Sequence, residues 1–233
     1  GTRDRLQEFI EKCGFPAQMV WQEHLEFRRS SLLNLALRKA TGRWVIFLDG
    51  DAIPHSEYVM DHVRRSEPGR FLVGRRIDLG PQISASLTRG QVRKGVLEGF
   101  SMKLLMSGLR KDSKHVGRIV RSLNPTIRGL LGYDRLSELR GSNFSVSRED
   151  LFAINGFDEA YVGYGGEDTD VELRFQNLGL TPKSVKGMAI QYHIWHPQRF
   201  GNTANNEHLE EVRRTKPVRC AKGLEQIPEE ALR

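Results

Sequence analysis

Cysteines and long apolar runs are scarce in this sequence, and both features limit what the protein can be. Only Cys13 and Cys220 occur among 233 residues, and neither belongs to a Cys-x-x-Cys pair that would bind zinc or carry out redox chemistry. No window approaches the roughly 18 apolar residues that a membrane-spanning helix requires, and the first ten residues lack the basic and apolar regions of a signal peptide. We therefore expect a cytoplasmic protein that was not exported.

Acidic residues are also scarce between residues 89 and 128, whose positive excess is larger than the formal net charge of +7 of the whole chain. Ten Lys or Arg stand there against Glu98 and Asp112, a local balance of +8. The segment lacks the set of aromatic side chains that would stack on single-stranded bases, so we expect no nucleic-acid partner. Two interpretations stay open: solvated helices packed on the core, or a surface for anionic lipid, at the inner face of a membrane, or for a lipid-linked acceptor.

Hydrophobic spacing predicts the main elements. Apolar residues at helical spacing predict a helix over 28–41, with serines available to cap its start. The apolar run after it predicts a strand buried on both faces of a parallel sheet. Further expected elements are a strand over 70–79, a helix from Val116 that Pro125 breaks near Asn124, a strand, helix, glycine loop and helix over 141–180, one or two strands over 183–197, and a helix over 205–216.

Two carboxylates stand at the end of the first predicted strand, in "VIFLDGDAIP". Open α/β sheets bind ligands at the carboxyl ends of their strands, which favours a site at Asp49 and Asp51. Two close carboxylates repel each other, and a divalent cation that prefers oxygen ligands would relieve that repulsion. A turn in which Asp caps backbone amides explains the same pattern, so Asp-x-Asp alone leaves both interpretations open.

Two further motifs hold groups with catalytic potential. In "GYGGEDTD", three glycines precede a cluster of acids at a predicted helix start, where the helix dipole stabilises carboxylates. One of these acids could be a general base for an acceptor hydroxyl. In "HIWHP", His193 and His196 could share a metal with a carboxylate from elsewhere, although a lone His-x-x-His is often incidental.

The order of these motifs resembles inverting glycosyltransferases of the GT-A fold, family 2, with a galactosyltransferase-like C-terminal domain. The matching stretches are "ATGRWVIFLDGDAIP", "GSNFSVSREDLFAINGFDEAYVGYGGEDTDVELRFQNLGL" and "HIWHP". The resemblance implies an α/β, Rossmann-like nucleotide-diphospho-sugar transferase with a mostly parallel central sheet flanked by helices and a basic helical insertion. It divides the chain into a nucleotide-sugar part (1–80), the basic insertion (81–139), an acceptor part (140–201), and a C-terminal helix and tail (202–233).

On the donor side, the resemblance implies that Asp51 holds Mn²⁺ or Mg²⁺ on the donor diphosphate, together with His196 and His193. Asp49 would contact the nucleotide ribose or the metal. The further donor-side candidates are Asn34 and Arg75.

On the acceptor side, Asp168 would deprotonate the acceptor hydroxyl and Glu167 would orient acceptor or donor sugar. Tyr164, where such relatives often have Trp, would be a platform for a sugar ring. The further sugar-binding candidates are Gly165, Gly166 and Asn143.

The family pattern begins with a strand, a helix and an acidic turn that we do not find ahead of "GTRDRLQEF", so we expect the first βαβ unit to be missing. The partners implied are a nucleotide-sugar, a UDP-sugar above all, and a glycan or lipid-linked acceptor. A competing hypothesis is a catalytically incompetent module that binds nucleotide-sugar or anionic lipid. A third, a metal hydrolase, lacks the helical His-Glu-x-x-His arrangement.

Overall fold

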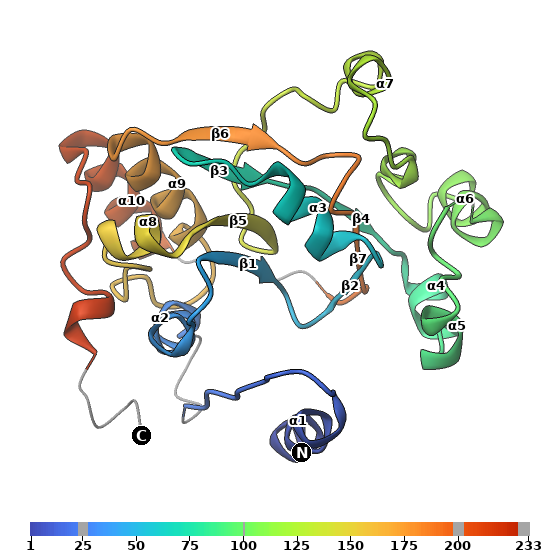
Figure 1. Cartoon of the computed structure of the whole chain (residues 1–233), viewed down its shortest axis with the longest axis horizontal. Helices are drawn as coiled ribbons and strands as arrows, with labels where there is room; N and C mark the ends of the chain where they lie inside the picture. Colours follow the sequence, from blue (N-terminus) through green and yellow to red (C-terminus); the bar gives the residue numbers. More distant parts are fainter. Residues whose placement is uncertain (23–27, 100, 198–202, 228–233) are drawn as a thin grey trace.

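The computed structural model describes residues 1–22, 28–99, 101–197 and 203–227 (Figure 1). Its strands are β1 (Trp44–Leu48), β2 (Ala52–Pro54), β3 (Arg70–Val73), β4 (Arg76–Asp78), β5 (Asn143–Ser147), β6 (Thr181–Ser184) and β7 (Gln191–His193). Its helices are α1 (Thr2–Lys12), α2 (Arg29–Lys39), α3 (Tyr58–Arg65), α4 (Pro81–Ser86), α5 (Arg89–Arg93), α6 (Met102–Leu109), α7 (Pro125–Leu130), α8 (Arg148–Ala153), α9 (Glu167–Asn177) and α10 (Thr203–Thr215), with 3-10 turns η1 (Val116–Ile119) and η2 (Leu224–Gln226). The predicted α/β class is confirmed.

The larger sheet has the strand order β1-β5-β3-β6. Strand β5 runs antiparallel to β1 and β3, whereas β3 and β6 are parallel, so β1, β3 and β6 point in one direction. The expectation that β1 is buried on both faces between parallel neighbours is wrong. In the described part of the chain β5 is the strand beside β1, and three of the five β1 residues are half-buried because the strand lies at the sheet's end.

The smaller sheet has the order β2-β7-β4 and continues the larger one beyond the β1 and β3 ends. The predicted strand over 70–79 is split between the two sheets, because β3 ends at Val73 and β4 begins at Arg76. Gly74 lies at the break, where an added Cβ would stand 2.1 Å from the Asn143 side-chain oxygen. Only a residue without a side chain allows this close approach.

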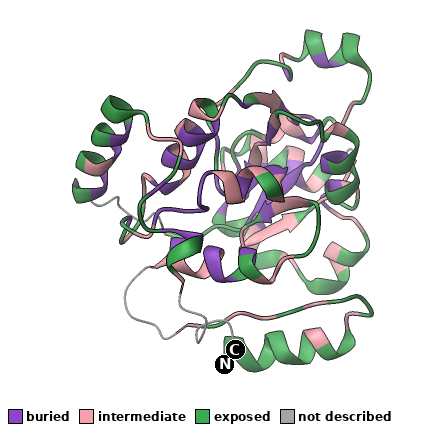
Figure 2. Cartoon of the chain, turned by 60° about the vertical axis from the view of Figure 1, so that its left-hand side comes forward, coloured by how far each residue is buried: buried purple, intermediate pink, exposed green. Residues whose placement is uncertain are grey.

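The main hydrophobic core lies between the larger sheet and helices α2, α8 and α9 (Figure 2). Phe71, Phe144 and Phe175 are fully buried there, and the rings of Phe47 and Phe144 stack with centroids 4.1 Å apart. A second core joins β4 and β7 to the 81–139 segment through residues such as Leu104 and Ile119. The segment is therefore packed onto the smaller sheet.

The helix expected from Val116 is wrong. The chain forms only the 3-10 turn η1 there, and Val120 is already extended. The Ser122 amide then donates a hydrogen bond to the Gly187 carbonyl, which ties the chain to another segment. Pro125 begins α7 rather than ending a helix, since the Asn124 side chain accepts hydrogen bonds from the first α7 amides.

The predicted helix over 28–41 is confirmed as α2, but its start is not capped by serine. Arg28 is the N-cap residue and makes no side-chain capping bond, while Ser30 and Ser31 lie inside the first turn. The helices expected near 167–178 and 205–216 are confirmed as α9 and α10. Among the described residues, every helix is too short or too polar to cross a membrane.

Candidate active site

The turn after β1 carries the Asp49 and Asp51 pair into contact with the smaller sheet. The Ala52 amide donates to the Asp49 carbonyl, which closes the turn, and β2 then pairs with β7 so that Ala52 faces His193. The Ile194 amide donates to the Asp51 carbonyl. This register places Asp51 beside the His-x-x-His stretch, more than 140 residues along the chain.

Asp51, His193 and His196 form one cluster. The His193 Nε2 lies 3.5 Å from one Asp51 carboxylate oxygen, and the His196 Nε2 lies 3.4 Å from the other. One ligand atom from each residue falls within 4.8 Å of the other two, as a shared metal ion requires. The Asp51 Oδ1 atom is buried and has no hydrogen-bond partner among the described residues. A buried, unpaired carboxylate oxygen is costly unless a cation contacts it, so the three residues fit a metal ion.

The surroundings of His193 favour the form that binds metals. Burial lowers its pKa, and the nearby Arg76 lowers it further against the attraction of Asp51. A lowered pKa keeps the imidazole neutral, and only the neutral ring has a lone pair for a metal. Asp78 lies in register with His193 on β4, with carboxylate oxygen and Nδ1 3.8 Å apart.

The glycine loop presents two acids at the start of α9. Gly163, Gly165 and Gly166 all have positive φ, and Gly166 is the N-cap of the helix. A Cβ on Gly166 would come within 2.7 Å of the Tyr161 ring, so this position needs glycine for both its conformation and its space. The loop brings Glu167 and Asp168 into the first turn of α9, where the helix dipole stabilises carboxylates.

Arg29, at the start of α2, joins the two acidic motifs. Its Nη2 donates to Asp49 Oδ1 at 3.2 Å, and its Nη1 donates to Asp168 Oδ1 at 3.0 Å and Glu167 Oε1 at 3.4 Å. Burial alone would lower the pKa of Arg29, but Asp168, Asp49 and Glu167 outweigh it and raise the pKa above its usual value. The guanidinium thus stays charged and contacts three carboxylates.

Glu167 and Asp168 have different environments. Glu167 is only 6% exposed, and burial followed by the charge of Asp168 raises its pKa. Asp168 is more open, and its Oδ2 accepts a hydrogen bond from the Gly141 amide at 2.8 Å. A Cβ on Gly141 would lie 2.2 Å from Asp168 Oδ1, so any larger residue would displace this carboxylate. Asp168 is therefore the acid that a second molecule can reach.

The structure does not bring every predicted residue to this site. Asn34 and Asn143 are fully buried, at 0% and 1% exposure, and their amides serve the fold. The Asn34 side chain pairs with both backbone groups of Phe157, and the Asn143 Nδ2 donates to the carbonyls of Arg75 and Ala189. The structure therefore places Asn34 and Asn143 away from the surface of the candidate site, with their side-chain amides paired inside the protein.

The other predicted residues stay accessible. Tyr164 is 48% exposed beside the two acids, and Gly165 donates its amide to Glu167. Arg75 is half-buried, and burial together with Arg140 and Arg118 lowers its pKa.

Arg29 and Gly141 were missed by the sequence analysis. Arg29 belongs to a predicted helix, but no local pattern distinguishes it from the neighbouring Arg28. Gly141 lies two residues before β5, and the close approach of the Asp168 carboxylate and the Arg29 guanidinium explains it.

Two family models match different parts of the chain. The model described as "Glycosyl transferase family 2" matches residues 1–86, and the model described as "N-terminal domain of galactosyltransferase" matches residues 127–197. The second match contains β5, the glycine loop and the His-x-x-His stretch.

The individual proteins with similar sequences are also glycosyltransferases by name. β-1,4-Galactosyltransferase 4 of Homo sapiens is 30% identical over 119 residues, which cover 50% of this chain and 33% of that protein. Chondroitin synthase of Escherichia coli is 22% identical over 209 residues, which cover 87% of this chain and 30% of that protein. This chain therefore spans about a third of the length of these relatives.

A solved structure, that of GalNAc-T7 with UDP, GalNAc and Mn²⁺, shares the fold. It superposes with a TM-score of 0.58 at 15% identity, over 91% of this chain and 39% of that one. The superposition shows that the chain has the GT-A fold, and the family matches show its similarity to glycosyltransferases. Residues 1–86 resemble family 2 glycosyltransferases, and residues 127–197 resemble galactosyltransferases.

Proposed function

We propose that this chain forms the site of a metal-dependent inverting glycosyltransferase, which moves a sugar from a UDP-sugar to a glycan or lipid-linked acceptor. One observation supports the proposal: Asp51, which lies beside His193 and His196, and Asp49, which Arg29 joins to Glu167 and Asp168, belong to the same turn after β1. Inverting transfer needs leaving-group stabilisation and a base on opposite faces of the reacting carbon. The two clusters supply these two functions separately.

Asp51, His193 and His196 would hold Mn²⁺ or Mg²⁺. When bound, the cation would neutralise the charge that develops on the departing diphosphate. The choice of a UDP-sugar donor is supported by GalNAc-T7, whose structure contains UDP, GalNAc and Mn²⁺.

Asp168 is the proposed base. Its carboxylate takes the proton of the acceptor hydroxyl as the acceptor oxygen bonds to the anomeric carbon and the bond from that carbon to the diphosphate breaks. Arg29 and the Gly141 amide hold the two carboxylate oxygens, so the side chain has a fixed orientation. Its partial exposure leaves room for the acceptor.

The other roles follow the same arrangement. Asp49 would contact the ribose or the metal, Glu167 would orient a sugar, and Tyr164 would provide an aromatic platform beside Gly165 and Gly166. Arg75 would act on the donor side. The division into parts at 1–80, 81–139, 140–201 and 202–233 belongs to this proposal too.

A peripheral contact with anionic membrane, through residues 89–128, is a further part of the proposal. On α6, Met102, Met106 and Leu109 follow helical spacing and are 65%, 40% and 78% exposed, so one apolar face points outward. Exposed Arg110 and Lys111 follow at its end. An apolar face bordered by basic residues is the pattern of helices that lie in an anionic membrane surface. Such a contact would hold the enzyme near a lipid-linked acceptor, at the inner face of the membrane.

The test compares Asp51→Ala and Asp168→Asn in the complete protein. Asp51→Ala should abolish Mn²⁺-dependent UDP binding in calorimetry. Asp168→Asn should keep that binding but lower UDP-sugar turnover by about a hundredfold or more, because removing a general base has effects of this size. Glu149→Gln, an exposed acid on α8, is the matched control and should change neither measurement.

Two outcomes would contradict the proposal. Near-normal turnover by Asp168→Asn would exclude Asp168 as the base. UDP binding without any transfer, in the complete protein and with a range of UDP-sugars, would favour the incompetent binding module instead.

A further inference from the structure

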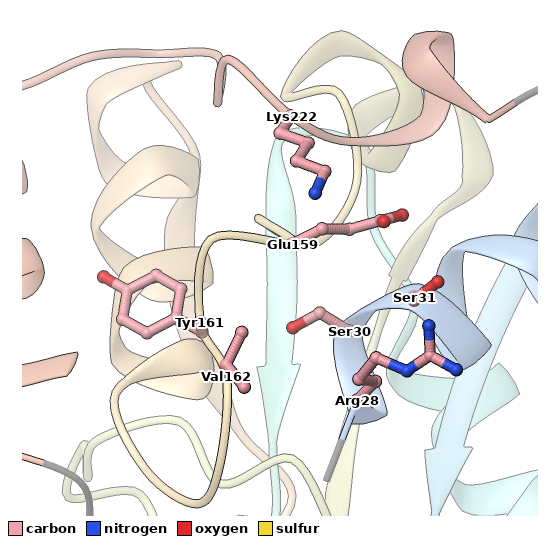
Figure 3. Close-up of a pocket in the computed structure, with 7 residues that line it drawn as sticks. All are labelled: Arg28, Ser30, Ser31, Glu159, Tyr161, Val162 and Lys222. Atoms are coloured by element: carbon pink, nitrogen blue, oxygen red, sulfur yellow. The ribbon is translucent and has the colours of Figure 1, made fainter. Parts of the chain in front are cut away.

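A cavity of about 120 Å³ lies between the start of α2 and the loop before the glycines (Figure 3). Its lining residues are Arg28, Ser30, Ser31, Glu159, Tyr161, Val162 and Lys222. It lies outside both the metal cluster and the acidic pair. A space of this size admits several water-sized groups, since one water needs about 10–15 Å³ of such volume.

Ser30 is the strongest sign that the cavity takes a ligand. The residue is 2% exposed, and its hydroxyl is buried without a hydrogen-bond partner among the described residues. Figure 3 shows this hydroxyl directed into the space beside Tyr161 and Val162. A buried hydroxyl without a partner costs free energy, and an acceptor atom placed in the cavity would remove that cost.

The charges around the cavity favour an anion. Arg28 and Lys222 contribute two positive charges, and Lys222 has no ion pair in the part of the chain that the structure describes. Glu159 contributes one negative charge, and the Asn34 Nδ2 already donates to its Oε1 at 3.1 Å. The positive end of the 11-residue helix α2, whose first amides lack intrahelical acceptors, adds to the balance.

The lining of the cavity adjoins the proposed active site, since the Tyr161 ring lies against Gly166, the residue before Glu167. Arg28 and Ser30 flank Arg29, whose guanidinium contacts Asp168. On the other side, the 159–162 stretch leads directly into the glycines before Glu167. A group bound in the cavity would therefore lie beside the acceptor position.

We propose that this cavity is an oxyanion subsite, which selects acceptors that carry a carboxylate, sulfate or phosphate group. The inference rests on the proposed function, since it names the acceptor of that same site. Ser30 would donate its hydroxyl proton to the anion, and Lys222 would pair with its charge.

The experiment measures binding of sulfate, phosphate, methyl β-glucuronide and the neutral methyl β-glucoside by calorimetry, at constant ionic strength. The three probes with oxyanions separate sulfate, phosphate and carboxylate as the preferred group. We expect saturable binding of at least one, and none of the glucoside. Ser30→Ala and Lys222→Gln should each weaken binding by about tenfold, the size of one hydrogen bond to a charged group.

Lys39→Gln is the matched control, because it removes one positive charge from the other end of α2 and should change affinity by less than about twofold. Mn²⁺-dependent UDP binding, measured in the same variants, should stay unchanged and shows that each is folded. No saturable oxyanion binding, or equal binding by Ser30→Ala, Lys222→Gln and the wild type, would overturn the inference. If the wild type did not bind UDP in the presence of Mn²⁺, the result would instead contradict the proposed function.

Discussion

The sheet region that carries the site and the 81–139 segment are held together in different ways. In the sheet region, polar side chains far apart in sequence pair inside the protein, as Arg29 does with Asp168 and His62 does with Ser145. In the 81–139 segment, short helices are stabilised by local caps, such as Ser101 and Asn124. Large apolar residues there stay exposed, with Leu130 at 83%. The 81–139 segment thus buries some of its apolar residues in the second core and leaves others exposed.

This difference indicates that the sheet region and the 81–139 segment have different roles. Buried, paired polar groups fix the positions of the catalytic candidates, so substitutions in the sheet region should lower stability. The outward apolar residues of the 81–139 segment add little to the core, and a partner surface is the simplest use for them. The following substitutions test this contrast.

Arg174→Met should give the largest loss of stability. Arg174 on α9 is fully buried, pairs with Asp170, and donates to the carbonyls of Ile154 and Gly156 at 2.7 Å. Removing it leaves the Asp170 carboxylate buried without a counter-charge. We expect the free energy of unfolding to fall by about 3–5 kcal/mol in urea titrations.

The control for this change is Arg214→Met. Arg214 pairs with Glu211 on the exposed face of α10, and surface pairs of this kind contribute little. A double variant, Arg174→Met with Asp170→Leu, should recover part of the loss because it removes the buried charge. If Arg174→Met and Arg214→Met were equally mild, the buried pair would not be what fixes α9.

His62 makes the stability of the sheet region depend on pH. It lies fully buried on α3, where its ring contacts Ser145 and Asn143 of β5 and the Tyr58 ring, and Asp61 is its charged neighbour. Burial lowers its pKa to about 4.

The direction of this pH dependence follows from the pH at which the unfolded and the folded chain each bind a proton at His62. Below a pH of about 6.5 the unfolded chain protonates this imidazole, whereas the folded chain does not until about 4. The contribution of His62 to stability is therefore complete above pH 6.5 and is lost as the pH falls toward 4, by about 3 kcal/mol in all. Unfolding free energies of wild type and His62→Gln, measured from pH 7.5 to 4, should converge by this amount. Parallel curves would contradict the prediction.

The sequence predicted several elements of the sheet region, among them α2 and α9, and it named most residues that lie together in the candidate site. The three residues of the candidate metal cluster could be named from the sequence because Asp51 follows an apolar strand and His193 and His196 end another. The β2 and β7 register, which only the structure shows, brings them together. The acids of the glycine loop were expected at a helix start, and α9 begins at Glu167.

The remaining features depend on contacts between distant residues. Asn34 and Asn143 have the polarity of ligand-binding residues, and only their burial shows that they serve the fold. Arg29 is one of 36 Lys and Arg residues, and only the position of α2 next to the start of α9 shows that it contacts Asp168. In the 81–139 segment, helical spacing failed at Val116, where Gly117 and β-branched residues weaken the helix and a hydrogen bond to Gly187 replaces it.

The smallest expected effect on stability is at the outward face of α6. A buried and an exposed leucine of this one helix can be compared directly. Leu104 is fully buried in the second core, whereas Leu109 is 78% exposed. Leu104→Ala should lower the free energy of unfolding by about 2–5 kcal/mol, because it leaves a cavity. Leu109→Ser should change it by less than about 0.5 kcal/mol, since a surface substitution of this kind breaks no packing.

The same Leu109→Ser variant should lose affinity for a membrane. The wild type should co-sediment with vesicles of phosphatidylglycerol and phosphatidylcholine but not with phosphatidylcholine alone, because the basic residues need anionic headgroups. The variant should bind the anionic vesicles about tenfold more weakly, since one large apolar side chain no longer enters the bilayer. If Leu109→Ser bound them as the wild type does, charge alone would account for the attraction, and the outward face of α6 would need a protein partner instead.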